Sequence, residues 1–205
     1  MPEGWEWSTI GAEVDAVGGS TPSTKDASLW DGDIAWTTPK DLSGLNSPIL
    51  SRTARTISQA GLRTISSGLL PAGTVLMSSR APVGYLAIAQ MPVAINQGYI
   101  AMRCDGRVSN WFAYLWAKAN MDAIIQNANG STFQEISKAN FRPLPILVPD
   151  EPVRSRFNEV IAPMFEQIIA NDAESRTLAQ TRDALLPKLM SGAIRFRDAE
   201  RAVAA

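Results

Sequence analysis

The sequence contains no histidine and a single cysteine, Cys104. Without histidine there is no Ser-His-Asp or Cys-His catalytic group, no imidazole general base near neutral pH and no His-containing zinc site. One cysteine cannot form an internal disulfide or a Cys-x-x-Cys site, so nothing in the cysteine content indicates an oxidising compartment. These absences exclude most enzyme classes that work near neutral pH.

Long hydrophobic runs are also missing. The longest apolar stretch, Tyr85 to Ile95, is interrupted by Gln90 and Pro92 and is far shorter than the roughly 20 residues that a membrane-spanning helix needs. Residues 1–6 carry neither the basic nor the apolar segment of a signal peptide. We therefore expect no membrane association and a cytoplasmic location.

The chain has little net charge, because 19 Lys and Arg balance 20 Asp and Glu, but the two signs are segregated. Residues 1–45 hold eight acids and two bases, whereas residues 46–145 hold three acids and nine bases. A basic middle section is typical of a protein that binds a phosphate backbone. Scattered solvated charge is the alternative, because the sequence does not place these bases on one face.

Glycine and proline punctuate the chain up to about Pro149, between short runs suited to strands at 34–38, 74–78 and 85–89. One helix is expected from about 110 to 126, with Ser109 as its N-cap. Its apolar stripe indicates core packing rather than a ligand site. The stripe consists of Phe112, Leu115, Trp116, Ala119 and Ile124.

Beyond Pro149, apolar residues recur in steps of three and four, which is the spacing of a helix. Pro163 predicts a short helix over 152–161 followed by a kink or restart, and Pro187 predicts that the second helix ends near Leu186. The middle of that helix is too polar to be stable alone, so a partner is expected. The predicted fold class is α+β: an irregular, sheet-rich domain at 1–149, then a helical region at 150–205.

Catalytic motifs are absent as well. There is no GxxxxGK[ST], GxGxxG or GxSxG sequence, and no Asn-Pro-Pro-aromatic sequence of the type found in amino-methyltransferases. A nuclease would need clustered carboxylates beside a lysine. Lys40, Asp41 and Glu135 are more simply interpreted as capping or solvated charges. We expect no catalytic residue, no metal site and no cofactor, with a histidine-free enzyme as a remote alternative.

Six motifs follow one another along the chain: Gly18-Gly19-Ser20-Thr21-Pro22-Ser23, Trp30 to Trp36, Thr38-Pro39-Lys40-Asp41, Leu70 to Gly84, Asn96-Gln97-Gly98-Tyr99 and Gly130-Ser131-Thr132-Phe133. In this order they resemble the target-recognition domain of type I restriction-modification specificity subunits. The tail from Leu178 to Gly192 resembles the conserved helical region of that family. The resemblance extends from about Trp5 to Phe196, and one departure is Ile95, where the family more often has threonine.

The resemblance implies a non-catalytic subunit that reads double-stranded DNA for methyltransferase subunits and an endonuclease/translocase subunit. Typical members hold two recognition domains and two helical regions, whereas this chain has one of each. It is therefore either a half-subunit that pairs with itself or a fragment, and its first residues favour a complete half. The half-subunit would form a homodimer, a coiled coil of the helical regions, and would read a bipartite site. Its expected dimer contacts are Met164, Ile168, Leu178 and Leu185.

Motifs shared by members that read different DNA sequences are expected to build the scaffold, with Gly73, Gly84, Gly98 and Gly130 serving special backbone geometry. Base readout is expected instead in the stretch 46–67. Its candidate base contacts are Arg52, Arg55 and Arg63, and the candidate phosphate contacts are Lys40, Arg80 and Lys138. For each of these bases, a solvated charge is the alternative. For the whole chain, the alternative is an interaction module that binds no nucleic acid.

Overall fold

A five-stranded sheet is the largest sheet of the computed structural model, which describes residues 1–130 and 134–194. Its strands, in order, are β2 (Asp15–Val17), β9 (Tyr99–Arg103), β6 (Val75–Ser79), β7 (Val83–Ala89) and β4 (Ile49–Leu50). Neighbours are antiparallel except β4 and β7, which are parallel. All five residues of β6 are buried, so the core of this part of the chain is built around the middle strand.

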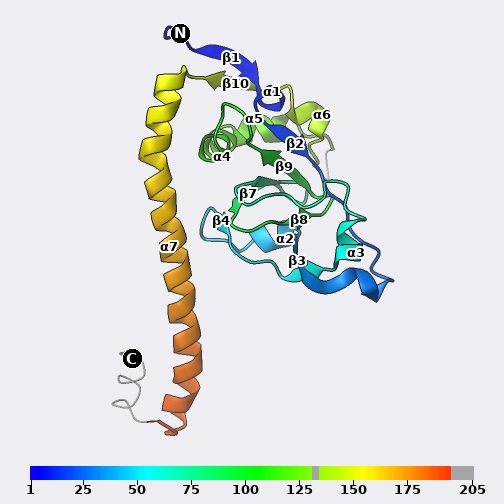
Figure 1. The fold of residues 1–205 in the computed structure, drawn as a ribbon, viewed down its shortest axis with the longest axis vertical. Helices are drawn as coiled ribbons and strands as arrows, with labels where there is room; N and C mark the ends of the chain where they lie inside the picture. The colour runs from blue at the N-terminus through cyan, green and yellow to red at the C-terminus, as the bar shows by residue number, and fades with distance from the viewer. Residues whose placement is uncertain (131–133, 195–205) are drawn as a thin grey trace. The chain divides into compact units, whose positions relative to one another are not determined.

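Two smaller sheets lie at opposite ends of residues 1–161 (Figure 1). At one end β1 (Glu6–Thr9) pairs with β10 (Pro145–Val148). At the other end β3 (Trp30–Thr37) lies between antiparallel β5 (Arg55–Ile57) and parallel β8 (Ala94–Ile95). A cluster of Trp30, Trp36, Ile57 and Ile65 forms a local core for this second sheet, apart from the main one.

Single-turn helices fill the connections: α1 (Ile10–Glu13), 3-10 helix η1 (Ala27–Leu29), α2 (Pro39–Leu42), α3 (Gln59–Leu62) and α6 (Lys138–Phe141). Polar side chains start several of them. The Oγ of Ser58 accepts the N–H of Gly61 at α3, and the Oγ of Ser137 accepts the N–H of Asn140 at α6. Elements of three or four residues are too short to show a hydrophobic period, so periodicity does not predict them.

The helix expected from 110 to 126 is two helices, α4 (Asn110–Ala119) and α5 (Met121–Gln126). Asn120 separates them, because its side-chain Nδ2 donates to the carbonyl of Trp116 and competes with the helical backbone. The N-cap prediction is confirmed, since Ser109 Oγ accepts the N–H of Phe112. Trp116 and Ile124 are buried as expected, but Ala119 is exposed.

One continuous helix, α7 (Glu151–Met190), replaces the two that Pro163 predicted, and Pro163 and Pro187 both lie inside it. A restart at Pro163 would require a second helix nucleation and would leave a new set of N–H and C=O groups unpaired. The free-energy cost of these two effects exceeds that of the one hydrogen bond lost at the proline. The helix also continues four residues past Leu186. It ends before Gly192, whose φ is +73°.

The α+β class is thus confirmed, and the three expected strands coincide with β3, β6 and β7. The chain divides into two compact units, 1–161 and 162–205, so the first turns of α7 belong with the sheets. Residues 131–133, which include most of the last recognition motif, and residues 195–205 lie outside the described residues. Among the described helices, none has the length and apolarity to cross a membrane.

Candidate nucleic-acid interface

The stretch 46–67 includes strands β4 and β5 and helix α3, and its three arginines are all exposed. Arg52 lies in the loop between β4 and β5, Arg55 is the first residue of β5, and Arg63 follows α3. Buried Ile49, Leu50 and Ile57 attach the same stretch to the body of the protein. An anchored backbone therefore presents three exposed cationic side chains.

A pair of tryptophans supports Arg55. The rings of Trp30 and Trp36 on β3 meet edge to face, with centroids 5.0 Å apart. The guanidinium carbon of Arg55 lies 3.5 Å from the centroid of the Trp30 ring and 5.9 Å from that of Trp36. Both rings are more than nine-tenths buried, so Arg55 covers the outer side of a rigid aromatic pair. The sequence alone does not distinguish this arginine from Arg52 and Arg63 and does not reveal the stack.

The motif that begins at Gly18 holds the tryptophan pair in place. The indole N–H of Trp30 donates to the carbonyl of Ser23, and that of Trp36 donates to the carbonyl of Ser20. A Cβ on Gly19 would lie 1.9 Å from the carbonyl oxygen of Ile95, so only glycine fits there. This motif therefore acts as scaffold for the arginine-bearing strand.

The loop of Gly18 and Ser20 is also tied to the end of the 46–67 stretch. Ser20 Oγ donates to the carbonyl of Thr64 at 3.0 Å and accepts the N–H of Ser66 at 3.1 Å. Lys138, the first residue of α6, brings its Nζ beside Gly18. The fold thus brings Lys138 and the residues just after Arg63 to the same loop, although they are far apart in sequence.

Asp41 is a capping residue, as its position among turn residues suggested. One carboxylate oxygen accepts the N–H of Thr38 at 2.8 Å, at the start of α2, and the other accepts the N–H of Ala54 at 2.8 Å. The same side chain therefore caps the start of α2 and anchors the loop that carries Arg52. Lys40, its neighbour on α2, is exposed.

The Asn96 to Tyr99 motif is structural. Asn96 Oδ1 accepts the N–H of Gly98, and the hydroxyls of Tyr99 and Thr37 share a hydrogen bond of 3.0 Å. Burial raises the pKa of the Tyr99 phenol, which keeps it neutral. Gly98 differs from the other three expected glycines. Gly73, Gly84 and Gly130 have positive φ, whereas Gly98 does not, and a Cβ at Gly98 would lie in tight contact, 3.0 Å from the Pro39 ring.

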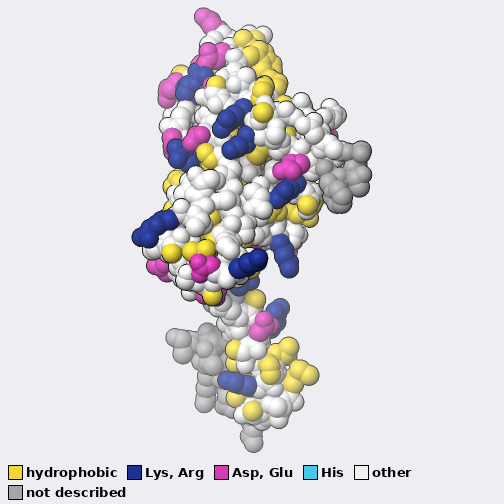
Figure 2. Space-filling view, turned by 90° about the vertical axis from the view of Figure 1, so that its right-hand side faces the viewer, with side chains coloured by type: hydrophobic (Ala, Val, Ile, Leu, Met, Phe, Trp, Pro, Cys, Tyr) yellow, Lys and Arg dark blue, Asp and Glu magenta, His cyan; other side chains and the backbone are white. Residues whose placement is uncertain are grey.

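The candidate DNA-binding residues differ in whether an acidic side chain lies close to them. Arg80 lies 3.8 Å from Glu135, so a phosphate contact by Arg80 would compete with an acid. Among the residues that the structure describes, Lys40, Arg52, Arg63 and Lys138 have no acid within ion-pair distance. Figure 2 shows the Lys and Arg side chains of the visible face spread out, with acids between them, rather than gathered into one patch.

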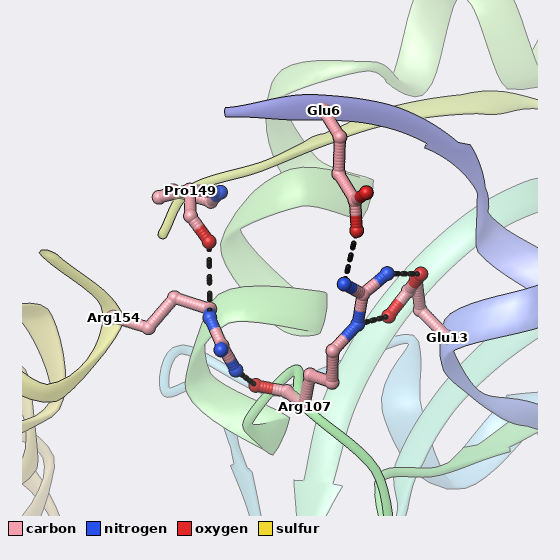
Figure 3. Close-up of polar contacts among 5 residues, drawn as sticks. All are labelled: Glu6, Glu13, Arg107, Pro149 and Arg154. Atoms are coloured by element: carbon pink, nitrogen blue, oxygen red, sulfur yellow. Dashed lines mark hydrogen bonds and ion pairs between the residues drawn. The ribbon is translucent and has the colours of Figure 1, made fainter. Parts of the chain in front are cut away.

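A charged joint lies at the other end of the unit, where the start of α7 meets the sheets (Figure 3). Arg107 binds both carboxylate oxygens of Glu13, whose side chain is 4% exposed, and also pairs with Glu6. Hydrogen bonding to Arg107 lowers the pKa of Glu13 below its ordinary value. Arg154 of α7 donates to the carbonyls of Arg107 and Pro149. This joint fixes the first turns of α7 to β1 and α1.

An open cleft of about 440 Å³ lies beside this joint, between α1, β2 and β9. Its acids are occupied by its bases: Arg103 contacts Asp15 at 3.2 Å and Asp105 at 3.5 Å. In the described part of the chain, no three His, Cys, Asp or Glu side chains are grouped as a metal site would require. The cleft therefore offers no cluster of free titratable groups for catalysis.

The fold defines a class, a mixed α+β unit followed by one long helix. The profile of a family described as type I restriction modification DNA specificity domain matches residues 2–181. The chain belongs to this family. Membership places it among specificity domains rather than among catalytic subunits, as the sequence predicted.

Two relatives are type I restriction enzyme specificity subunits. The chain is 34% identical to the MjaIX subunit of Methanocaldococcus jannaschii over 182 residues, covering 88% of this chain and 42% of that protein. It is 25% identical to the HindI subunit of Haemophilus influenzae over 197 residues, covering 95% of this chain and 42% of that protein. The chain therefore spans less than half the length of these relatives.

Solved structures share the fold at lower identity. The HsdS subunit from Thermoanaerobacter tengcongensis matches 92% of this chain with a TM-score of 0.57 and 20% identity, and 45% of that chain is covered. The type I restriction-modification S subunit from M. genitalium matches 91% with a TM-score of 0.62 and 15% identity, and 46% of that chain is covered. This chain thus shares its fold with somewhat less than half of each of these chains.

Proposed function

We propose that this chain is the sequence-reading part of a type I restriction-modification complex and directs methyltransferase and endonuclease/translocase subunits to its DNA site. The observation that carries the proposal is the family match over residues 2–181. In this proposal residues 1–149 read double-stranded DNA and residues 150–205 serve assembly, with the complex acting on the chromosome in the cytoplasm.

The surfaces support a division of labour among the basic residues. The stretch 46–67 is anchored by its buried apolar residues and exposes Arg52, Arg55 and Arg63. Such exposed arginines suit contact with base edges in the major groove. Lys40 and Lys138 lie without acidic partners among the described residues and suit phosphate oxygens. Arg80 is the weakest of the phosphate candidates, because Glu135 already lies beside it.

Exposed apolar side chains on α7 support homodimerisation of half-subunits, with a fragment of a longer protein as the alternative. Met164 and Leu178 on α7 are 55% and 59% exposed, and Ile168 and Leu185 are half-buried. Exposed apolar side chains on a helix favour a partner helix, and a two-fold axis would supply a second copy of α7. Two recognition units related in this way would read two inverted half-sites.

DNA binding is tested by gel-shift titration of the full chain at two salt concentrations, with and without its methyltransferase subunits. We expect weak binding alone, tighter binding with the methyltransferase, and an affinity that falls as salt rises because released counterions drive the association. A chain that recruits methyltransferase but shifts no duplex at low salt would instead be the pure interaction module.

Dimerisation is tested by sedimentation of a Met164→Glu/Leu178→Glu variant. We expect dimers for the wild type at tens of micromolar and monomers for the variant, because each charge would be buried unpaired in the helix interface. Leu69→Glu is the matched control, since Leu69 is 45% exposed but lies far from α7 in sequence, and it should stay dimeric. A monomeric wild type would refute the half-subunit proposal.

The 40 residues of α7 give a rod of about 60 Å, which suggests that its length sets the distance between half-sites. Seven residues inserted near Asn171 keep the helical face over two turns and lengthen the rod by about 10 Å, or about three base pairs. Methylation mapping of an active insertion variant should show the longer spacer. An unchanged spacer would show that another part of the complex sets the distance.

A further inference from the structure

We infer that Arg55 is the residue of this unit that reads a guanine, and that Trp30 is the positioning residue that holds its guanidinium for this purpose. The inference rests on the proposed DNA recognition and deepens it by naming one base contact and its support. It distinguishes Arg55 from Arg52 and Arg63, which the sequence does not separate.

The first argument is preorganisation. An exposed arginine loses much rotamer freedom when it docks, and this loss weakens binding. The guanidinium of Arg55 is already stacked 3.5 Å from the Trp30 ring centroid, so part of that freedom is lost before DNA arrives. No such aromatic support is recorded for Arg52 or Arg63 among the described residues.

The second argument is that the donors stay available. A stacked guanidinium keeps its N–H groups in the plane of the group, pointing away from the ring face. Arg55 is exposed, and within the described chain no hydrogen bond or ion pair uses its side-chain N–H groups. Two parallel N–H donors match the O6 and N7 acceptors of guanine in the major groove.

The third argument concerns the backbone under Arg55. In the β5-β3-β8 sheet, β5 is an edge strand, and Arg55 pairs with Trp36 across the β3–β5 ladder. Thr53 Oγ1 donates to the Arg55 carbonyl at 2.8 Å, and Asp41 holds the N–H of Ala54. As the edge strand of a three-stranded sheet, β5 carries Arg55 at the margin of that sheet, where its side chain can reach base edges in the major groove.

The experiment begins with duplexes selected from a random library by the wild-type chain with its methyltransferase subunits. Affinity is then measured for the selected duplex and for duplexes with each G·C pair changed in turn. We expect Arg55→Lys to lose about 5- to 150-fold of the preference at one G·C pair, because an ammonium cannot make the bidentate contact. Affinity for unrelated DNA and its salt dependence should hardly change, because the positive charge is kept.

Trp30 variants separate positioning from folding. Trp30→Phe keeps an aromatic face and should keep most of the preference at that pair, whereas Trp30→Leu should lose it at the same pair and at no other. Near-UV circular dichroism selects variants that remain folded. Lys118→Ala is the matched control, since it removes an exposed cation of α4 that lies outside the 46–67 stretch, and it should leave the preference at every G·C pair unchanged.

The outcomes separate the two levels of the argument. A wild-type complex that selects no sequence contradicts the proposed function itself. A wild type that selects a site, with Arg55→Lys keeping full preference at every G·C pair, overturns the guanine assignment and leaves DNA recognition intact. The assignment is also wrong if Arg55→Ala weakens selected and unrelated duplexes equally and lowers the salt slope by one, since Arg55 would then hold a phosphate.

Discussion

Replacing Asp41 with alanine should destabilise the recognition unit and loosen the loop that carries Arg52. The Asp41 carboxylate accepts two backbone N–H groups at 2.8 Å, from Thr38 and from Ala54. Hydrogen bonds to a charged acceptor contribute about 1.5–3 kcal/mol each, and water replaces part of this at a half-buried site. We therefore expect a loss of about 2–3 kcal/mol, which corresponds to about 4–12 °C in Tm for a unit of this size.

Urea unfolding followed by tryptophan fluorescence measures this loss, because all six tryptophans lie between residues 5 and 116 and report on the first unit. Asp41→Asn should lose about half as much, since an amide offers one acceptor oxygen and turns a donor toward the other N–H. Asp33→Ala is the matched control. Asp33 is exposed on β3 with no ion pair among the described residues, so the change should stay within about 0.5 kcal/mol.

The reasoning would be refuted by an Asp41→Ala variant as stable as the Asp33→Ala control. The variant also bears on DNA reading, since a released loop would no longer fix the backbone next to Arg55. In the selected-duplex assay we expect reduced preference together with reduced stability. Lost preference at full stability would assign Asp41 a direct role at the DNA rather than a capping role.

Three further predictions concern protonation and the long helix. Because Arg107 lowers the pKa of Glu13, the stability that this pair contributes is present at neutral pH and is lost as the pH falls below about 4.5. In urea unfolding across pH 3–7, the free energy of unfolding of Glu13→Gln should therefore fall less steeply at acid pH than that of the wild type. Burial raises the pKa of the Cys104 thiol to about 12, so Ellman's reagent at pH 8 should react with it slowly in the native chain and quickly in urea; equal rates would contradict the burial. Pro163→Ala restores a helical N–H and should stabilise α7 by up to about 3 kcal/mol, raising the thermal midpoint of the 222 nm circular dichroism signal, and an unchanged midpoint would show that the helix already compensates for the proline.

The sequence predicted those helices and strands that show a regular apolar spacing or an uninterrupted run of apolar or β-branched residues. Strands β3, β6 and β7 contain uninterrupted apolar or β-branched runs, and Ser109 with the apolar residues behind it marked the start of α4. It missed β4 and β8, which have two residues each and are held in place by pairing across the chain. Such strands depend on tertiary contacts, and no local pattern specifies them.

Two errors in the helices have physical causes. The prediction of a kink or restart at Pro163 assumed the effect that proline has in an isolated helix. A helix of 40 residues loses less stability from one missing hydrogen bond than from two new helix ends. At Asn120 the side chain competes for the backbone carbonyl of Trp116, a contact that apolar periodicity does not register. The stacking of Arg55 on Trp30 could not be predicted either, because it depends on a tertiary contact. Trp30 and Arg55 are 25 positions apart, and only the β3–β5 pairing brings them together.

The pairing of β1 with β10 also constrains how the protein is made. Thr9 lies opposite Pro145, and Glu6 lies opposite Val148. At ribosomal rates of about 5–20 residues per second, β1 is therefore synthesised roughly 7–28 s before β10. During that interval Trp7, 66% exposed even in the finished fold, belongs to an unpaired strand. Strand β1 therefore pairs only after β10 has been synthesised, so this sheet of the unit forms late in the synthesis of the unit.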